Sequence, residues 1–216
     1  MAIVKESREV QDFEEVAMEG HGDLVIVQGD AEMLEIEADE EVLPKLKTEV
    51  RGRRLVLGYR SWWDWLTPPW GGPPIHYTVT MKTVRGVVIS GSGTVTAGEI
   101  RTDDLRLEMS GSGRGTIDRL TADTLELRVS GSGRLEVGGG EVGEQEITIS
   151  GSGSLRAEEL TSEEADVRIS GSGNIRLHAE KALNVHISGS GEVRYRGQPV
   201  VSQRISGSGS IAPLDA

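Results

Sequence analysis

The chain has 216 residues, of which 35 are acidic and 23 are Lys or Arg, so its formal net charge is −12 at pH 7. With that balance and no Lys/Arg-rich run, a nucleic-acid partner is not expected. The absence of cysteine excludes disulfides and thiolate chemistry, and no stretch approaches the roughly 18 consecutive apolar residues of a transmembrane segment.

The first residues bear on the cellular compartment. Met1 to Val4 run directly into charged sequence and do not form the apolar core of a secretory signal peptide. The sequence therefore indicates either a cytoplasmic protein or one from which an export signal has been trimmed, and it leaves the localisation unknown.

Residues 1–60 predict irregular strands. Apolar and polar residues alternate around Leu24 and Ile26, and again around Leu34 and Ile36, which is the period of a β-strand. Residues 40–50 have room for one or two helical turns broken by Pro44. Atypical terminal repeats protect the open end of a repeat domain, so this segment is expected to form N-terminal coils and a cap.

Residues 61–75 form a Trp/Pro-rich segment that is expected to be a loop. It holds four of the seven prolines and all four tryptophans, namely Trp62, Trp63, Trp65 and Trp70. Aromatic residues at this density either fold back over their own domain as a lid or form a contact patch for a protein, a glycan or a membrane interface.

Residues 76–211 are dominated by a repeat of the tetrapeptide Ser-Gly-Ser-Gly. Its seven copies begin at Ser90, Ser110, Ser130, Ser150, Ser170, Ser188 and Ser206. The interval between copies is constant up to Ser170 and slightly shorter after it, which predicts a cross-section that narrows toward the C-terminus. A nearly fixed period is typical of a stacked architecture, in which each unit needs the next one to cover its apolar face.

Each unit reads as β-strand. Apolar and polar residues alternate along it: one face carries Leu125, Leu127, Val129 and the glycines that follow, and the other carries Glu126, Arg128 and the serines. No unit has helical spacing, and a propeller blade needs about 40 residues. The sequence therefore predicts an all-β, single-domain β-solenoid over residues 1–216, with about seven regular coils of 16–20 residues and a short tail at residues 212–216.

Two reasons explain the glycines of the tetrapeptide. A narrow coil brings its walls close together, and a corner can demand a positive φ, which glycine adopts without steric penalty. Either reason predicts that Gly131→Val severely destabilises the fold. If the alternation of inward and outward side chains continues through the tetrapeptide, the serines face solvent in columns. If a corner interrupts that alternation, the serines line an inner ladder instead.

No cofactor, metal or catalytic site is indicated. The four histidines are scattered and lack a metal-ligand spacing. Seven identical Ser-Gly-Ser-Gly copies argue against one of them being a nucleophile elbow. Outward carboxylates such as Glu126 and Glu146 lie beside Arg128 and Arg168 in the adjoining column, which favours charge compensation over a catalytic groove. We therefore expect no enzymatic activity.

The last coil suggests how the protein functions. Ile205, Gly207, Gly209 and Ile211 belong to a full-quality repeat near residue 216, and the remaining tail is too short for a capping helix. An uncapped coil exposes unpaired backbone groups, so we expect a structural or adhesive module that associates end to end into a homo-oligomer or filament. The alternatives are glycan or surface binding through the serines and tryptophans and, less favoured, a carbohydrate-active enzyme.

These features together resemble a known family. Residues 8–16 (REVQDFEEV), 23–29 (DLVIVQG) and 46–50 (LKTEV) precede the serial Ser-Gly-Ser-Gly units, in an order similar to the bacterial putative auto-transporter adhesin, head GIN domain family. The resemblance covers nearly the whole chain. It implies a right-handed β-helix domain, often exported and surface-associated, with no established biochemical activity. The missing signal peptide and the Trp/Pro segment depart from the family pattern.

Overall fold

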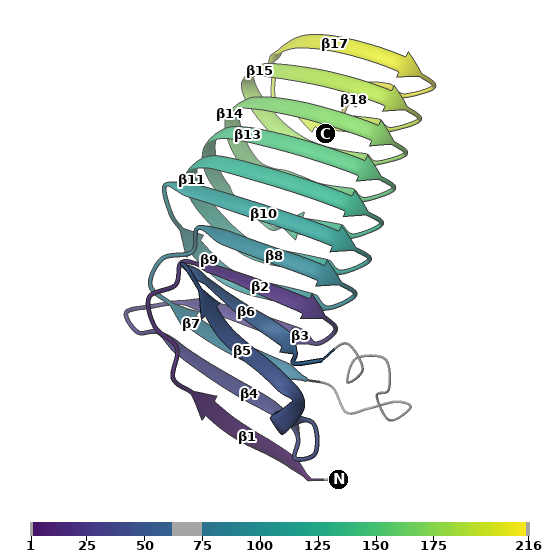
Figure 1. Ribbon diagram of the computed structural model, residues 1–216. Helices are drawn as coiled ribbons and strands as arrows, with labels where there is room; N and C mark the ends of the chain where they lie inside the picture. Colours follow the sequence, from purple (N-terminus) through teal and green to yellow (C-terminus); the bar gives the residue numbers. More distant parts are fainter. Residues whose placement is uncertain (1, 62–74, 215–216) are drawn as a thin grey trace.

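The computed structural model describes residues 2–61 and 75–214, and in these residues it consists of β-strands and one short 3-10 helix. Figure 1 shows the strands stacked as the rungs of a solenoid that rises from the N-terminal to the C-terminal end. The chain runs along the near side of each rung, returns on the far side and advances by one rung, which makes the coil right-handed. The stack completes about six turns, so the predicted all-β solenoid is confirmed and its seven coils were a close estimate.

Each regular rung has three walls joined by corners. The first wall ends in the first Ser-Gly of the tetrapeptide and consists of β8 (Gly86–Gly91), β10 (Asp104–Gly111), the last parts of β11 (Arg114–Gly131), β13 (Gly140–Gly151), β14 (Ser154–Gly171) and β15 (Asn174–Gly189), and β17 (Val200–Gly207). The second wall follows the tetrapeptide corner and consists of β9 (Thr94–Arg101), the first parts of β11, β14 and β15, and the short strands β12 (Arg134–Val137), β16 (Glu192–Arg196) and β18 (Ser210–Pro213). The third wall is a short return stretch, formed by the end of β9, by the middle of β11 and by the start of β13, which pair with one another.

Neighbouring rungs pair in parallel with a shift of one repeat. Ser110 lies beside Ser90 on one side and Ser130 on the other, and the same register continues to Ser206. The seven tetrapeptides therefore form a single column of corners. Successive tetrapeptides are 20 residues apart up to Ser170 and 18 residues apart in the last two coils, so the predicted minimum of 16 residues does not occur.

The core is a narrow column inside the walls. Ile147 and Ile149 are fully buried, whereas their neighbours Glu146 and Ser150 are exposed, as the period of two requires. Burying one such aliphatic side chain contributes roughly 1.5–3 kcal/mol. Two polar residues interrupt the column in the regular rungs. Ser162 is buried and its Oγ donates to the His178 carbonyl at 2.8 Å. Gln145 is buried, its Nε2 donates to the Leu160 carbonyl at 3.5 Å, and its Oε1 has no partner.

The two glycines of each tetrapeptide have different roles. The first, such as Gly131, has a φ of 119° at the corner. The second, such as Gly153, is buried, and a Cβ there would lie 2.6 Å from Cγ1 of Val129 on the previous rung. A Cβ at Gly131 would also lie 2.5 Å from the Gly111 carbonyl oxygen, so close approach of the walls applies to both glycines of the pair, whereas a positive φ applies only to the first.

The N-terminal rungs are stacked out of sequence order. Strands β2 (Glu15–Gly20) and β3 (Asp23–Gln28) form one rung, and β8 and β9 pair with it in parallel on the C-terminal side. The rung on its other side comes from later in the chain, from β6 (Arg54–Tyr59) and β7 (His76–Met81). The corner between β2 and β3 is a degenerate copy of the tetrapeptide, since Glu19 and Gly20 pair with Ser90 and Gly91.

Antiparallel strands close this end of the stack (Figure 1). Strand β4 (Met33–Asp39) pairs with β7 and with β1 (Ile3–Arg8), and β5 (Leu46–Arg51) pairs with β6. The helical turns expected around Pro44 shrink to one 3-10 helix at Leu43–Lys45. Arg8 fastens β1 to this region, because its guanidinium donates at 3.0 Å to the Leu43 and Leu46 carbonyls and to Oγ1 of Thr48.

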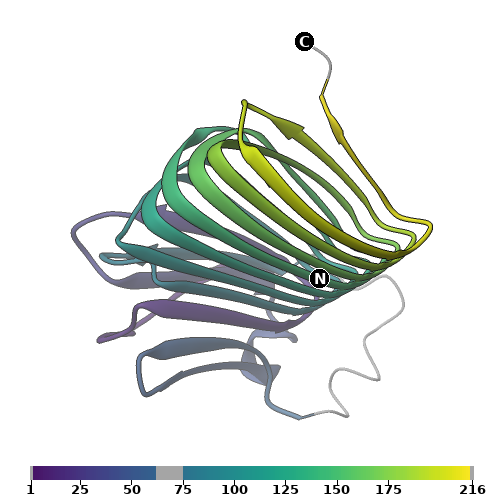
Figure 2. The same ribbon diagram turned by 90° about the horizontal axis from the view of Figure 1, so that it is seen from above.

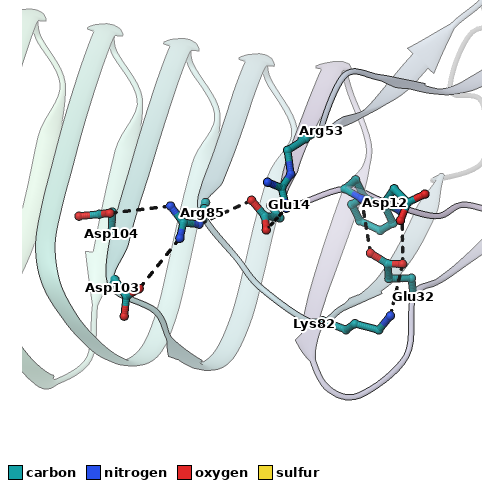
Figure 3. A network of polar contacts seen from close by, with 9 residues as sticks. Asp12, Glu14, Glu32, Arg53, Lys82, Arg85, Asp103 and Asp104 are labelled. Atoms are coloured by element: carbon teal, nitrogen blue, oxygen red, sulfur yellow. Dashed lines mark hydrogen bonds and ion pairs between the residues drawn. The ribbon is translucent and has the colours of Figure 1, made fainter.

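A polar network on one corner links the irregular rungs to the regular ones (Figure 3). Glu14 forms an ion pair with Arg53 and another with Arg85 at 3.5 Å. Arg85 also approaches Asp103 and Asp104 on the next rung, at 4.0 and 3.9 Å. These contacts cross the place where the chain leaves its sequential stacking order.

Candidate interaction surfaces

The final rung leaves its inward side chains uncovered. In the part of the chain that the structure describes, β17 pairs only with β15 and β18 only with β16. Ile205 takes the same inward position as Ile187 on the rung below, yet it is 37% exposed whereas Ile187 is 0% exposed. Seen from the C-terminal end (Figure 2), β17 and β18 lie nearest the viewer.

The backbone of this rung also has unused hydrogen-bonding capacity. The N–H groups of Ser208 and Ser210 donate back to the Gly189 and Gly191 carbonyls, at 2.9 and 3.0 Å. In a parallel ladder alternate residues face opposite neighbours, so the backbone groups of the four predicted edge residues point away from the stack. These are Ile205, Gly207, Gly209 and Ile211. Pro213 shares their parity and has no N–H to offer.

The serine column lies on the surface beside a groove. Ser110 to Ser206 are exposed and Ser90 is half-buried. At the N-terminal end of the column, a groove of about 680 Å³ is lined by Glu19, Tyr59, the serines Ser90, Ser92 and Ser112, and corner glycines. The Tyr59 hydroxyl lies 3.3 Å from Nε2 of His21. The four tryptophans that were predicted to form a lid or a contact patch lie outside the described residues.

Sequence reasoning missed this groove. Its signal was the segment from Glu19 to Gly22, which reads Glu-Gly-His-Gly and matches the spacing of the tetrapeptide without its serines. Tyr59 gave no local signal, because it reaches the groove only through the pairing of β6 with β2, two strands that are distant in the chain.

The outer face of the first wall is electrostatically compensated. Nε of Arg106 donates to Glu126 on the next rung at 2.8 Å, and Arg168 pairs with Glu146 at 3.0 Å. The hydrogen bond and the charge of Glu126 raise the pKa of Arg106. Exposed pairs of this kind contribute little to folding stability on their own.

Within residues 2–61 and 75–214, no group of three or more His, Asp or Glu side chains is arranged to hold a metal ion. The imidazole of His178 pairs with Glu180 at 2.8 Å, and that of His76 with Asp23 at 3.4 Å. The same residues include no helix long and apolar enough to cross a membrane.

Comparison with known proteins places this architecture in a family. Residues 12–199 match the family described as putative auto-transporter adhesin, head GIN domain. The chain belongs to this family. The resemblance seen in the sequence is thereby confirmed, and the family and the β-solenoid fold of this head GIN domain are consistent with a non-enzymatic, adhesin-like module.

Solved structures similar to this head GIN domain share its fold at low sequence identity. A putative adhesin from Bacteroides fragilis has a TM-score of 0.92 and 21% identity, covering 99% of this chain and 97% of that chain. A putative lipid binding protein from Parabacteroides distasonis has a TM-score of 0.77 and 23% identity, and a putative adhesin from the same organism has 0.73 and 22%, both with the same coverage. No curated protein matches the chain.

Proposed function

We propose that this head GIN domain is a non-enzymatic adhesin-like module whose final rung associates with a second copy of the chain. The observation that carries the proposal is the contrast between Ile187, which is covered, and Ile205, which is not. A partner strand along β17 would bury that side chain and satisfy the backbone groups that point away from the stack. The association would then supply the next rung that every other rung already has.

Two geometries are compatible with this contact. A two-fold contact brings two final rungs together and stops at a dimer, whereas a head-to-tail contact repeats into a filament. The distinction is measurable, because only the second geometry gives a mass that keeps rising with concentration. The family resemblance favours an exported, surface-associated location for such an assembly.

Light scattering across a concentration series tests the proposal. The monomer mass is 23.2 kDa, and we expect masses well above this value at high concentration. Ile205→Lys places a charge on the uncovered rung and should return the protein to monomer. Val25→Lys is the matched control, since Val25 is 42% exposed on the side of the stack and should leave association unchanged. A strict monomer at high concentration, or equal effects of the two variants, would contradict the proposal.

A second candidate function is glycan binding at the serine corners. It is favoured by the groove that joins Tyr59 and Glu19 to Ser90 and Ser92, because an aromatic ring, a carboxylate and hydroxyls are suitable partners for a sugar. A glycan array probed with the native chain and with a chain lacking residues 61–74 tests the predicted contribution of Trp62, Trp63, Trp65 and Trp70. Identical profiles would exclude that contribution.

A further inference from the structure

Arginines gather on the outer face of the second wall, the far side that β9 and β18 mark in Figure 1. The register places Arg114 directly beside Arg134, and it places Arg156, Arg176 and Arg194 side by side on three successive rungs. Like charges directly opposite each other on neighbouring strands are destabilising. This arrangement is unexpected in a chain whose net charge is −12.

The surrounding carboxylates compensate these arginines incompletely. Among the described residues, Arg194 pairs with Glu192 at 2.7 Å, whereas Arg176 has a carboxylate partner only at 3.7 Å, in Glu158. Arg114, Arg134 and Arg156 form no ion pair with any described carboxylate. On the first wall, by contrast, three outward arginines are paired with carboxylates: Arg106 with Glu126, Arg128 with Glu126, and Arg168 with Glu146 and Asp166.

The wall is hollowed where these arginines meet. Ser154 and Asn174 follow Arg134 in the same column, and their short side chains leave a depression of about 230 Å³. Arg134, Arg156, Arg176 and Arg194 line it together with Ser154, Asn174 and one carboxylate, Glu192. Guanidinium groups bind sulfate and carboxylate groups through paired hydrogen bonds, and the hydroxyl and the amide add neutral donors.

We infer that the second wall is a binding surface for an acidic polysaccharide. Successive rungs repeat about every 4.8 Å, so the wall offers a straight, rigid row of cationic donors to an extended polymer with regularly spaced anionic groups. Single-stranded nucleic acid needs aromatic side chains on which bases stack. The four described aromatic residues outside histidine do not provide them, because Phe13 and Tyr77 are buried, Tyr195 packs against the core and Tyr59 lies at the groove.

This inference does not depend on the contact at the final rung. The arginines lie on the side of the solenoid and remain accessible whether or not β17 is covered. A failure of end-to-end association would therefore leave the second wall unaffected, and a failure of polysaccharide binding would leave the final rung unaffected.

Titration calorimetry with dextran sulfate and with polygalacturonate, using neutral dextran as the uncharged probe, tests the inference. The test variant combines Arg134→Gln, Arg156→Gln and Arg176→Gln. The control combines Arg106→Gln, Arg128→Gln and Arg168→Gln on the first wall, so both variants lose the same three charges. We expect binding to the acidic polymers that weakens with salt, and a loss of affinity on the order of tenfold or more in the test variant alone.

Several results would overturn the inference. Absence of binding to either acidic polymer would do so, as would equal losses of affinity in the two variants or equal binding of neutral dextran. The wall would serve another class of partner if an oligothymidylate or anionic phospholipid vesicles bound the native chain more tightly than both polysaccharides do, and if the test variant lost that binding. Matching circular dichroism spectra of the three proteins would confirm that the comparison is made between folded chains.

Discussion

Replacing Gly131 with alanine is expected to lower the free energy of unfolding by about 2–4 kcal/mol. The corner residue has a φ of 119°, and holding an L-residue in such a region costs about 1–3 kcal/mol. The new Cβ would lie 2.5 Å from the Gly111 carbonyl oxygen. That oxygen accepts the hydrogen bond from the Ser132 N–H at 2.9 Å, so relieving the overlap weakens a bond worth about 1 kcal/mol.

Urea unfolding followed by far-ultraviolet circular dichroism measures this loss. Gly98→Ala is the matched control, because a Cβ at Gly98 meets no atom within 4 Å and its φ is not positive; it should change stability by no more than about 0.5 kcal/mol. Gly131→Val should be worse than Gly131→Ala, since its branched side chain enlarges the same overlap. If Gly131→Ala unfolds at the urea concentration of Gly98→Ala, the corner does not require glycine and the reasoning fails.

Three other substitutions probe the core and the corner network. Burial raises the pKa of Tyr77, so the phenol ionises near pH 10 only in the unfolded chain. The free energy of unfolding therefore falls above that pH by up to about 1.4 kcal/mol per pH unit. Tyr77→Phe should reduce this alkaline loss, and a variant with the same dependence of stability on pH as the native chain would contradict the prediction. Gln145→Leu removes the unpartnered Oε1 from the core and should stabilise the fold by about 1–2 kcal/mol, as read by the urea midpoint; a lower midpoint would count against it. Arg85→Gln breaks contacts of an arginine that is 47% exposed and should cost about 0.2–1 kcal/mol, while a loss above about 2 kcal/mol would show that the network stabilises the N-terminal rungs in another way.

The regular rungs could be predicted because every local signal repeats. Leu125, Leu127 and Val129 give the strand period, and Ser130 returns at the same place in each unit. The N-terminal order could not be predicted, because the pairing of β2 with β6 joins strands that are separated by an intervening antiparallel segment. The sequence from Arg54 to Tyr59 does not distinguish a strand that stacks on the C-terminal side of the preceding rung from one that stacks on its N-terminal side.

The arginine surface shows a different limit of sequence reasoning. Arg156, Arg176 and Arg194 each lie at the same place after the tetrapeptide of their own unit, so they recur with the repeat itself. The signal was therefore present, but an overall charge of −12 concealed a basic column that only the register reveals. A repeat protein is better searched for function column by column than by its composition.

The two ends of the solenoid are chemically different, and this bears on how copies can associate. At the N-terminal end the antiparallel strands β1 and β5 carry charged residues on both strands. Arg8 joins β1 to β5 through two hydrogen bonds, to the Leu46 carbonyl and to Oγ1 of Thr48, and to the 3-10 helix through a third, to the Leu43 carbonyl. Charged, antiparallel edge strands discourage the addition of another strand. At the other end β17 has a parallel edge and the uncovered Ile205. Because the described strands at the N-terminal end are closed by antiparallel pairs and offer no matching parallel rung, the two-fold contact between final rungs is favoured over head-to-tail growth, and the mass should level off at twice that of the monomer.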